Sequence, residues 1–246
     1  MTLKNEYWSQ AIIKKDSLGR EFCYVPDSNF LYGRDRVLSK IVSPFYMAKF
    51  PVSSSQFKHF VKETGYDYDL FDIMDQLSPK PDCPATPISW QNAKAYARWL
   101  RSITGEYYSV PSEEEWEMAA RGSDGRMYPW GSDSPSEDHG NFSLTSHNSQ
   151  TEESGIYPLN VSPFGCLDMI GNVWEWCLDE IDEYGEAHIM RGGSCVNDIS
   201  YCNCNSRCYE SPSDKRVLYA GFRLIYLPED MYLRYRSSIE KKVVNS

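Results

Sequence analysis

The stretch Gly165-Cys-Leu-Asp-Met-Ile-Gly-Asn-Val-Trp-Glu-Trp176 decides the fold of this chain. Arg191-Gly-Gly-Ser194 follows it, and Gly221-Phe-Arg-Leu224 closes the series. Glycine permits a positive φ angle or a close approach between two backbones. Arginine can connect loops by donating hydrogen bonds to carboxylates and carbonyl oxygens. We therefore expect Arg121, Arg191 and Arg223 to hold an irregular backbone together, as structural and not catalytic residues.

The composition argues against two broad classes of function. The chain has 246 residues, a formal net charge of −10 and an isoelectric point near 4.9. A nucleic-acid surface needs clustered lysine and arginine, so this acidity argues against one. No apolar run approaches the roughly 20 residues that span a bilayer. The first residues lack the apolar core of a signal peptide. We expect a cytoplasmic protein. Display on a surface or association with a virion is also compatible with the sequence.

Helices and short strands share the chain. Ser53, Ser89 and Ser112 each precede an amphipathic segment, and Gln56 and Glu115 complete two capping boxes. Alternating apolar and polar residues predict strands over 21–50, and we expect a last strand over 220–226. Residues 66–88 are rich in Asp and Pro and are expected to form a loop. The polar tail, 234–246, is expected to be a short helix or disordered. Because no linker divides the chain, we predict one α+β domain over residues 1–246.

Seven motifs, in order, resemble the successive signatures of the formylglycine-generating enzyme (sulfatase-modifying factor) family. The resemblance covers residues 40–225, and it implies a C-type-lectin-like fold with little regular secondary structure and bound divalent cations. A single one of these motifs would be weak evidence, whereas seven in order are specific. The motifs are Ile88–Ala93, Val110–Gly122, Tyr128–Gly131, Gly140–Phe142, Ser162–Trp176, Arg191–Ser194 and Gly221–Arg223.

The same resemblance implies a structural Ca²⁺ site. Its ligands would be the side chains of Asp168 and Glu175 and the carbonyl oxygens of Gly171 and Val173. Carboxylate and carbonyl oxygens are the ligands that Ca²⁺ prefers. The alternative is that Asp168 and Glu175 cap turns while Trp174 and Trp176 belong to the core.

The catalytic chemistry of the family depends on two cysteines, five residues apart, that follow the Arg-Gly-Gly-Ser motif and bind copper. Soft thiolates suit Cu(I). In this chain the second position is Cys202, but the first is Asn197, which supplies no thiolate. Cys195 lies two residues earlier, so a copper-dependent oxidase acting on a protein cysteine would have to use Cys195 with Cys202. We keep this reaction, and its copper, as the alternative function.

Residues 195–209 differ in composition from the rest of the chain. Asn, Ser, Tyr, Cys and Asp dominate, whereas Lys, Glu, Gln, Met and Trp do not occur. The segment resembles the variable region of proteins diversified by retroelements, in which the adenines of codons such as AAC are randomised. Tyr offers a large contact area at low entropy cost, and Asn and Ser offer adaptable hydrogen bonds.

We therefore predict a non-catalytic protein that displays a hypervariable surface and binds a protein or another macromolecule. The predicted ligand contacts are Val196, Asn197, Asp198, Ser200, Tyr201, Asn203, Asn205 and Tyr209. An ordinary polar loop of this length is the alternative explanation of the composition.

Overall fold

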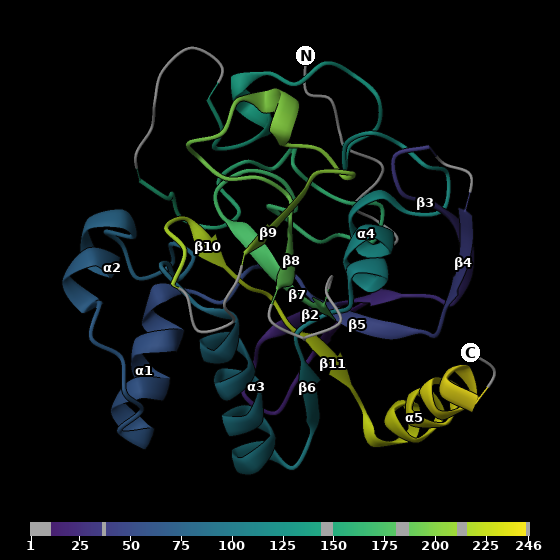
Figure 1. The fold of residues 1–246 in the computed structure, drawn as a ribbon, viewed down its shortest axis with the longest axis horizontal. Coiled ribbons are helices and arrows are strands. Elements are labelled where there is room, and N and C mark those ends of the chain that lie inside the picture. Colours follow the sequence, from purple (N-terminus) through teal and green to yellow (C-terminus); the bar gives the residue numbers. More distant parts are fainter. Residues whose placement is uncertain (1–10, 36–37, 144–149, 181–186, 211–215, 245–246) are drawn as a thin grey trace.

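Two sheets and a hairpin organise the computed structural model, which describes residues 11–35, 38–143, 150–180, 187–210 and 216–244 (Figure 1). The first sheet is antiparallel, in the order β1 (Ile13–Lys15), β2 (Glu21–Val25), β5 (Phe45–Ala48), β11 (Ile225–Leu227) and β6 (Tyr107–Ser109). The second has the order β10 (Ala220–Gly221), β7 (Trp174–Glu180), β8 (His188–Arg191) and β9 (Arg207–Glu210). β3 (Ser28–Tyr32) pairs with β4 (Leu38–Val42) as the hairpin. The predicted α+β class is confirmed.

The predicted helix starts are confirmed. α1 (Ser54–Thr64), α3 (Trp90–Thr104) and α4 (Glu113–Arg121) begin after Ser53, Ser89 and Ser112, and each has a complete capping box. In each case the serine hydroxyl accepts from the backbone N–H three residues on, which satisfies a donor that the helix itself leaves unpaired. Figure 1 shows α1, α2 and α3 together on one side of the molecule, with α5 and the β3–β4 hairpin on the other.

Two helices differ from the predictions. α2 (Phe71–Leu77) lies within the segment expected to be a loop, and it has no side-chain cap. Its seven residues are too few for a clear periodicity, and burial of Met74 fixes it in place. α5 (Glu229–Val244) begins before the expected tail. The Tyr232 ring stacks on Tyr107 with the ring centroids 4.4 Å apart, a tertiary contact that local sequence does not reveal.

The single strand expected over 220–226 is wrong, because the chain changes sheets within it. β10 pairs with β7 in the second sheet, and β11 pairs with β5 and β6 in the first. Phe222, Arg223 and Leu224 connect the two, and the carbonyls of Phe222 and Leu224 accept from Val52 and Ala48. This crossing places Arg223 between the sheets.

Arg223 and Glu175 form a fully buried ion pair at this crossing. The Nε and Nη2 atoms of Arg223 lie 2.6 and 2.7 Å from the two oxygens of Glu175, and Trp116 Nε1 donates to the same carboxylate over 2.7 Å. The guanidinium also donates to the carbonyls of Ala48, Leu167 and Asp168. One side chain thus connects three segments, as the sequence predicts for the arginines of these motifs.

Two hydrophobic clusters fill the interior. One contains α1, α3, Trp176 and Phe222, and the other surrounds Trp116 of α4. Among the described residues, no helix combines the length and the hydropathy that a membrane crossing requires.

We expect Arg223→Met to lower the free energy of unfolding by about 3–5 kcal/mol, because it leaves the Glu175 carboxylate buried without its partner. Adding Glu175→Gln should recover part of that loss, since the remaining group is then neutral. Urea denaturation of the single and double variants measures both effects. Arg98→Met, at an exposed position of α3, is the matched control. A loss no larger than that of the control would contradict the assignment.

Candidate functional site

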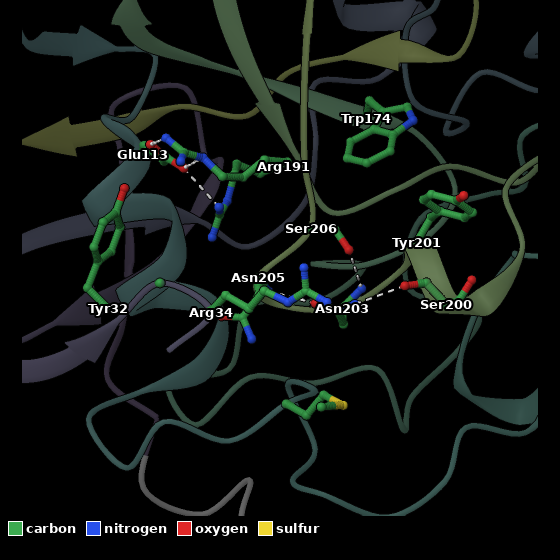
Figure 2. A pocket seen from close by; sticks show the side chains of 13 residues that line it. Tyr32, Arg34, Glu113, Trp174, Arg191, Ser200, Tyr201, Asn203, Asn205 and Ser206 are labelled. Carbon is green, nitrogen blue, oxygen red and sulfur yellow. Dashed lines mark hydrogen bonds and ion pairs between the residues drawn. The ribbon is translucent and has the colours of Figure 1, made fainter. Parts of the chain in front are cut away.

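A cavity of about 750 Å³ opens between the β3–β4 hairpin, the start of α4 and the segment that follows Arg191-Gly-Gly-Ser194. Figure 2 shows Trp174 and Tyr201 on the side opposite Tyr32 and Glu113. The described residues that line the cavity are Tyr32, Gly33, Arg34, Glu113, Met127, Trp174, Arg191, Ser200, Tyr201, Asn203, Asn205, Ser206 and Arg207.

Glu113 forms two ion pairs at this cavity. Its Oε1 accepts from Arg191 Nη1 over 2.8 Å and from Arg207 Nε over 2.5 Å, and its Oε2 accepts from Arg207 Nη2 over 2.6 Å. Tyr32 also hydrogen-bonds to Glu113; burial, and then this bond, raise the pKa of the tyrosine. The carboxylate is therefore fully engaged by the protein itself.

A second glutamate lies behind the first. Glu117 accepts from Arg191 Nη2 over 2.5 Å, from Arg121 Nη1 over 2.6 Å and from the backbone N–H of Gly33 over 2.8 Å. Arg121 and Arg191 are fully buried. Arg191 also donates to the Cys204 carbonyl, and Arg121 donates to the Asn205 side chain. These arginines hold the segment after residue 195 against α4.

Cysteines anchor that segment in the core. Cys195, Cys202 and Cys204 are fully buried, and the latter two pack in the cluster around Trp116. Between them the chain turns outward, so that Tyr201 is 62% exposed. Buried thiols thus alternate with residues that face the cavity.

The chain at Tyr201 and Cys202 packs closely against Arg191-Gly-Gly-Ser194, and this contact requires glycine in the motif. Gly193 has φ +82°, and a Cβ atom there would lie 2.5 Å from the Cys202 sulfur and 2.9 Å from the Tyr201 carbonyl oxygen. At Gly192, with φ +97°, a Cβ atom would lie 2.8 Å from the Met169 carbonyl oxygen. These two positions account for both glycines of the motif.

The structure brings together only half of the predicted ligand contacts at the cavity. Ser200, Tyr201, Asn203 and Asn205 line it. Val196 and Asp198 are exposed but do not line it. Tyr209 pairs with Ile189 across β9 and β8, and its side chain lies outside what the structure describes.

Asn197 and Asn205 serve the loop itself. The Asn197 side-chain oxygen accepts from the Ser194 hydroxyl over 2.6 Å and from the Ser194 backbone over 3.1 Å. The Asn205 side-chain oxygen accepts from Arg121, and the Asn205 N–H donates to Asn203. Both residues are half-buried, so a ligand would reach little of either.

The residues that line the cavity opposite segment 195–209 were not predicted from the sequence. Tyr32, Arg34 and Glu113 are more than eighty residues away from the segment in sequence, and no local pattern connects them to it. Among the lining residues that were not predicted, Arg207 could have been, because it lies within the segment of unusual composition, 195–209.

The two cysteines of the alternative reaction do not line the cavity. Burial raises the pKa of Cys195 and of Cys202 to about 12, so both are protonated thiols in this arrangement. A reactive or metal-binding cysteine is normally a thiolate with a lowered pKa. Within the described ranges, no three side chains of His, Cys, Asp or Glu gather as a metal site.

The predicted Ca²⁺ ligands lie close to the Arg223–Glu175 pair. The Glu175 carboxylate accepts from Arg223 and Trp116, so a cation would have to share that carboxylate with a guanidinium. Asp168 fits a cation better. Its carboxylate is buried, it accepts from the Gly155 N–H over 2.7 Å, and burial raises its pKa to about 6. Gly171 and Val173 are buried in the same loop, and the calcium site itself stays a prediction.

Comparisons with known proteins cover most of the chain. The profile of the sulfatase-modifying factor enzyme 1-like domain matches residues 10–227. Formylglycine-generating enzyme of Thermomonospora curvata is 29% identical, over 80% of this chain and 87% of its own. Inactive C-alpha-formylglycine-generating enzyme 2 of Mus musculus is 26% identical, over 71% and 74%. Variable protein 1 of Treponema denticola shares the fold, with a TM-score of 0.68 and 18% identity over 88% of this chain and 99% of its own.

Asp168→Asn separates the calcium prediction from a purely structural role. The amide keeps an oxygen for the Gly155 N–H but is not charged, so the variant should be at least as stable as the wild type in calcium-free buffer. Calcium should stabilise only the wild type, by about 2.7 kcal/mol at a hundredfold excess over its dissociation constant. Thermal unfolding with and without Ca²⁺ measures this. Equal stabilisation of both proteins would place calcium elsewhere.

Proposed function

Since the chain belongs to the family of sulfatase-modifying factor enzyme 1-like domains, we propose that it uses the fold of this family as a scaffold for binding. In this proposal the chain binds a protein ligand without catalysis, through the cavity and the exposed residues of segment 195–209. The segment would be the diversified part of a retroelement variable protein, and the remaining motifs would be its constant frame.

The proposal rests on one observation: buried residues and exposed residues alternate within segment 195–209. Cys195, Cys202 and Cys204 are buried, whereas Ser200 and Tyr201 are exposed between them. The stability of the fold rests on distant groups such as Arg223 and Glu175, so the exposed positions can change at little cost. An open cavity lined by Tyr, Ser and Asn has the chemistry of an adaptable binding surface.

The second candidate is the copper-dependent oxidation of a protein cysteine. The sequence relation to formylglycine-generating enzymes favours it. The burial of Cys195 and Cys202, and the structural part played by Asn197 at the position of the first thiolate, argue against it.

A display library tests the binding proposal. Simultaneous randomisation of Val196, Asp198, Ser200 and Tyr201 should leave most clones folded, because single exposed substitutions change stability by only about 0.5 kcal/mol. Surface expression and retained thermal unfolding score folding, and selection against a purified protein target should then give binders. Randomisation of Glu113, Glu117, Arg121 and Arg191 is the control and should abolish folding. Equal loss of folding in both libraries would contradict a variable surface.

Copper titration tests the alternative. With the thiols protonated and buried, the native protein should not take up stoichiometric Cu(I), and a sulfatase-type cysteine peptide should stay unmodified by mass spectrometry. Cys202→Ser should behave like the wild type in both assays. Stoichiometric copper together with conversion of the peptide to an aldehyde, both lost in Cys202→Ser, would establish the oxidase instead.

A further inference from the structure

The cavity carries an excess of positive charge on an acidic protein. Three arginines and one glutamate are among its described lining residues, Arg34, Arg191, Arg207 and Glu113, whereas the whole chain has a net charge of −10. Glu117, behind the wall, is balanced by Arg121. A concave site with one sign of charge concentrates ligands of the opposite sign.

The acidic groups of the site are already used by the protein. Glu113 accepts from Arg191 and Arg207, and Glu117 accepts from Arg121 and Arg191. A basic ligand would therefore have to displace Arg191 or the half-exposed Arg207 from an ion pair, and for the buried Arg191 this costs several kcal/mol. An anionic ligand needs no such displacement.

Two arginines of the cavity hold hydrogen-bond donors for which the described residues supply no acceptor. Arg191 is 1% exposed, and its Nε has no hydrogen-bond partner among the described residues. A buried donor without a partner is costly and rare in folded proteins. Arg34 lies on the rim, at an exposed position after β3, and Figure 2 shows its side chain among the lining residues. An oxyanion in the cavity would provide acceptors for these donors.

The opposite side of the cavity is aromatic. Tyr201 is 62% exposed and Trp174 contributes to the lining, so an apolar neighbour of the anion would find a contact surface there. Asn203 and Ser200 add polar groups between the two sides. A planar guanidinium pairs with a planar carboxylate through two parallel hydrogen bonds.

From these observations we infer that the cavity binds the carboxylate of an Asp or Glu side chain on the ligand protein, with Arg34 and Arg191 as its donors. Tyr201 contacts the residue next to that acidic side chain. This inference rests on the proposed function for the nature of the ligand, and it adds the chemistry that the ligand must present.

Arginine Nε–Hε resonances in ¹⁵N-labelled full-length protein test the inference. The probe is the α-amide of N-acetylglutamate, whose only charge is the side-chain carboxylate, and the α-amide of N-acetylglutamine is its neutral control. We expect saturable shifts of the Arg191 and Arg34 resonances with the glutamate amide and none with the glutamine amide. Arg34→Ala should weaken the binding about tenfold, the loss of one charge-assisted hydrogen bond. Arg98→Ala changes the net charge equally at a distant exposed position of α3 and should leave the binding unchanged.

Three outcomes would overturn the inference. The first is equal shifts with both probes, and the second is equal weakening by Arg34→Ala and Arg98→Ala. The third is tighter binding of inorganic phosphate than of the N-acetylglutamate α-amide, which would indicate a phosphate site. Folding and binding of the display-library clones are scored separately from the carboxylate probe. If the library clones fold and give binders but the probe does not bind, only this inference is rejected. If the probe binds but the library clones do not fold, only the proposed variable surface is rejected.

Discussion

The buried pair of Arg223 and Glu175 is the interaction on which the rest of the structure depends. Long stretches of this chain are neither helix nor strand, and their carbonyl oxygens need donors away from water. Arg223 donates to Glu175 and to the carbonyls of Ala48, Leu167 and Asp168. A buried ion pair adds little net stability compared with apolar residues of the same size. Its contribution here is positional: it fixes the crossing between two sheets and the loop before β7.

A second set of buried charges performs the same task at the cavity. Arg191 and Arg121 connect the 195–209 segment to α4 through Glu113 and Glu117. The helix supplies both glutamates from one face, because they lie four residues apart. Arg207, from the 195–209 segment, also pairs with Glu113, and its side chain is half-exposed. The buried charges of the cavity, Glu113 and Arg191, are therefore held in place by ion pairs, and the exposed residues of the segment lie between such fixed points.

In the proposed binding role, the frame of this family carries recognition in place of chemistry. The cysteines Cys195, Cys202 and Cys204 are buried, and the Asn197 side chain accepts from the Ser194 hydroxyl. The proposed binding role uses the exposed Tyr201 and Ser200, and the inferred carboxylate site adds the exposed Arg34 and the buried Arg191.

The sequence alone determined the elements whose causes are local. The capping boxes at Ser53, Ser89 and Ser112 fix three helix starts, and the ordered motifs fix the fold, because each is a short-range pattern. The tertiary structure alone decided the rest. The wall opposite the segment comes from Tyr32, Arg34 and Glu113, which only folding brings near residue 201. It also decided that the side chains of Asn197 and Asn205 hydrogen-bond within the protein, while Ser200 and Tyr201 are exposed at the cavity. The composition of the segment indicates which residue types it offers for binding. Which of those residues are exposed depends on how the segment packs against residues that are distant in sequence.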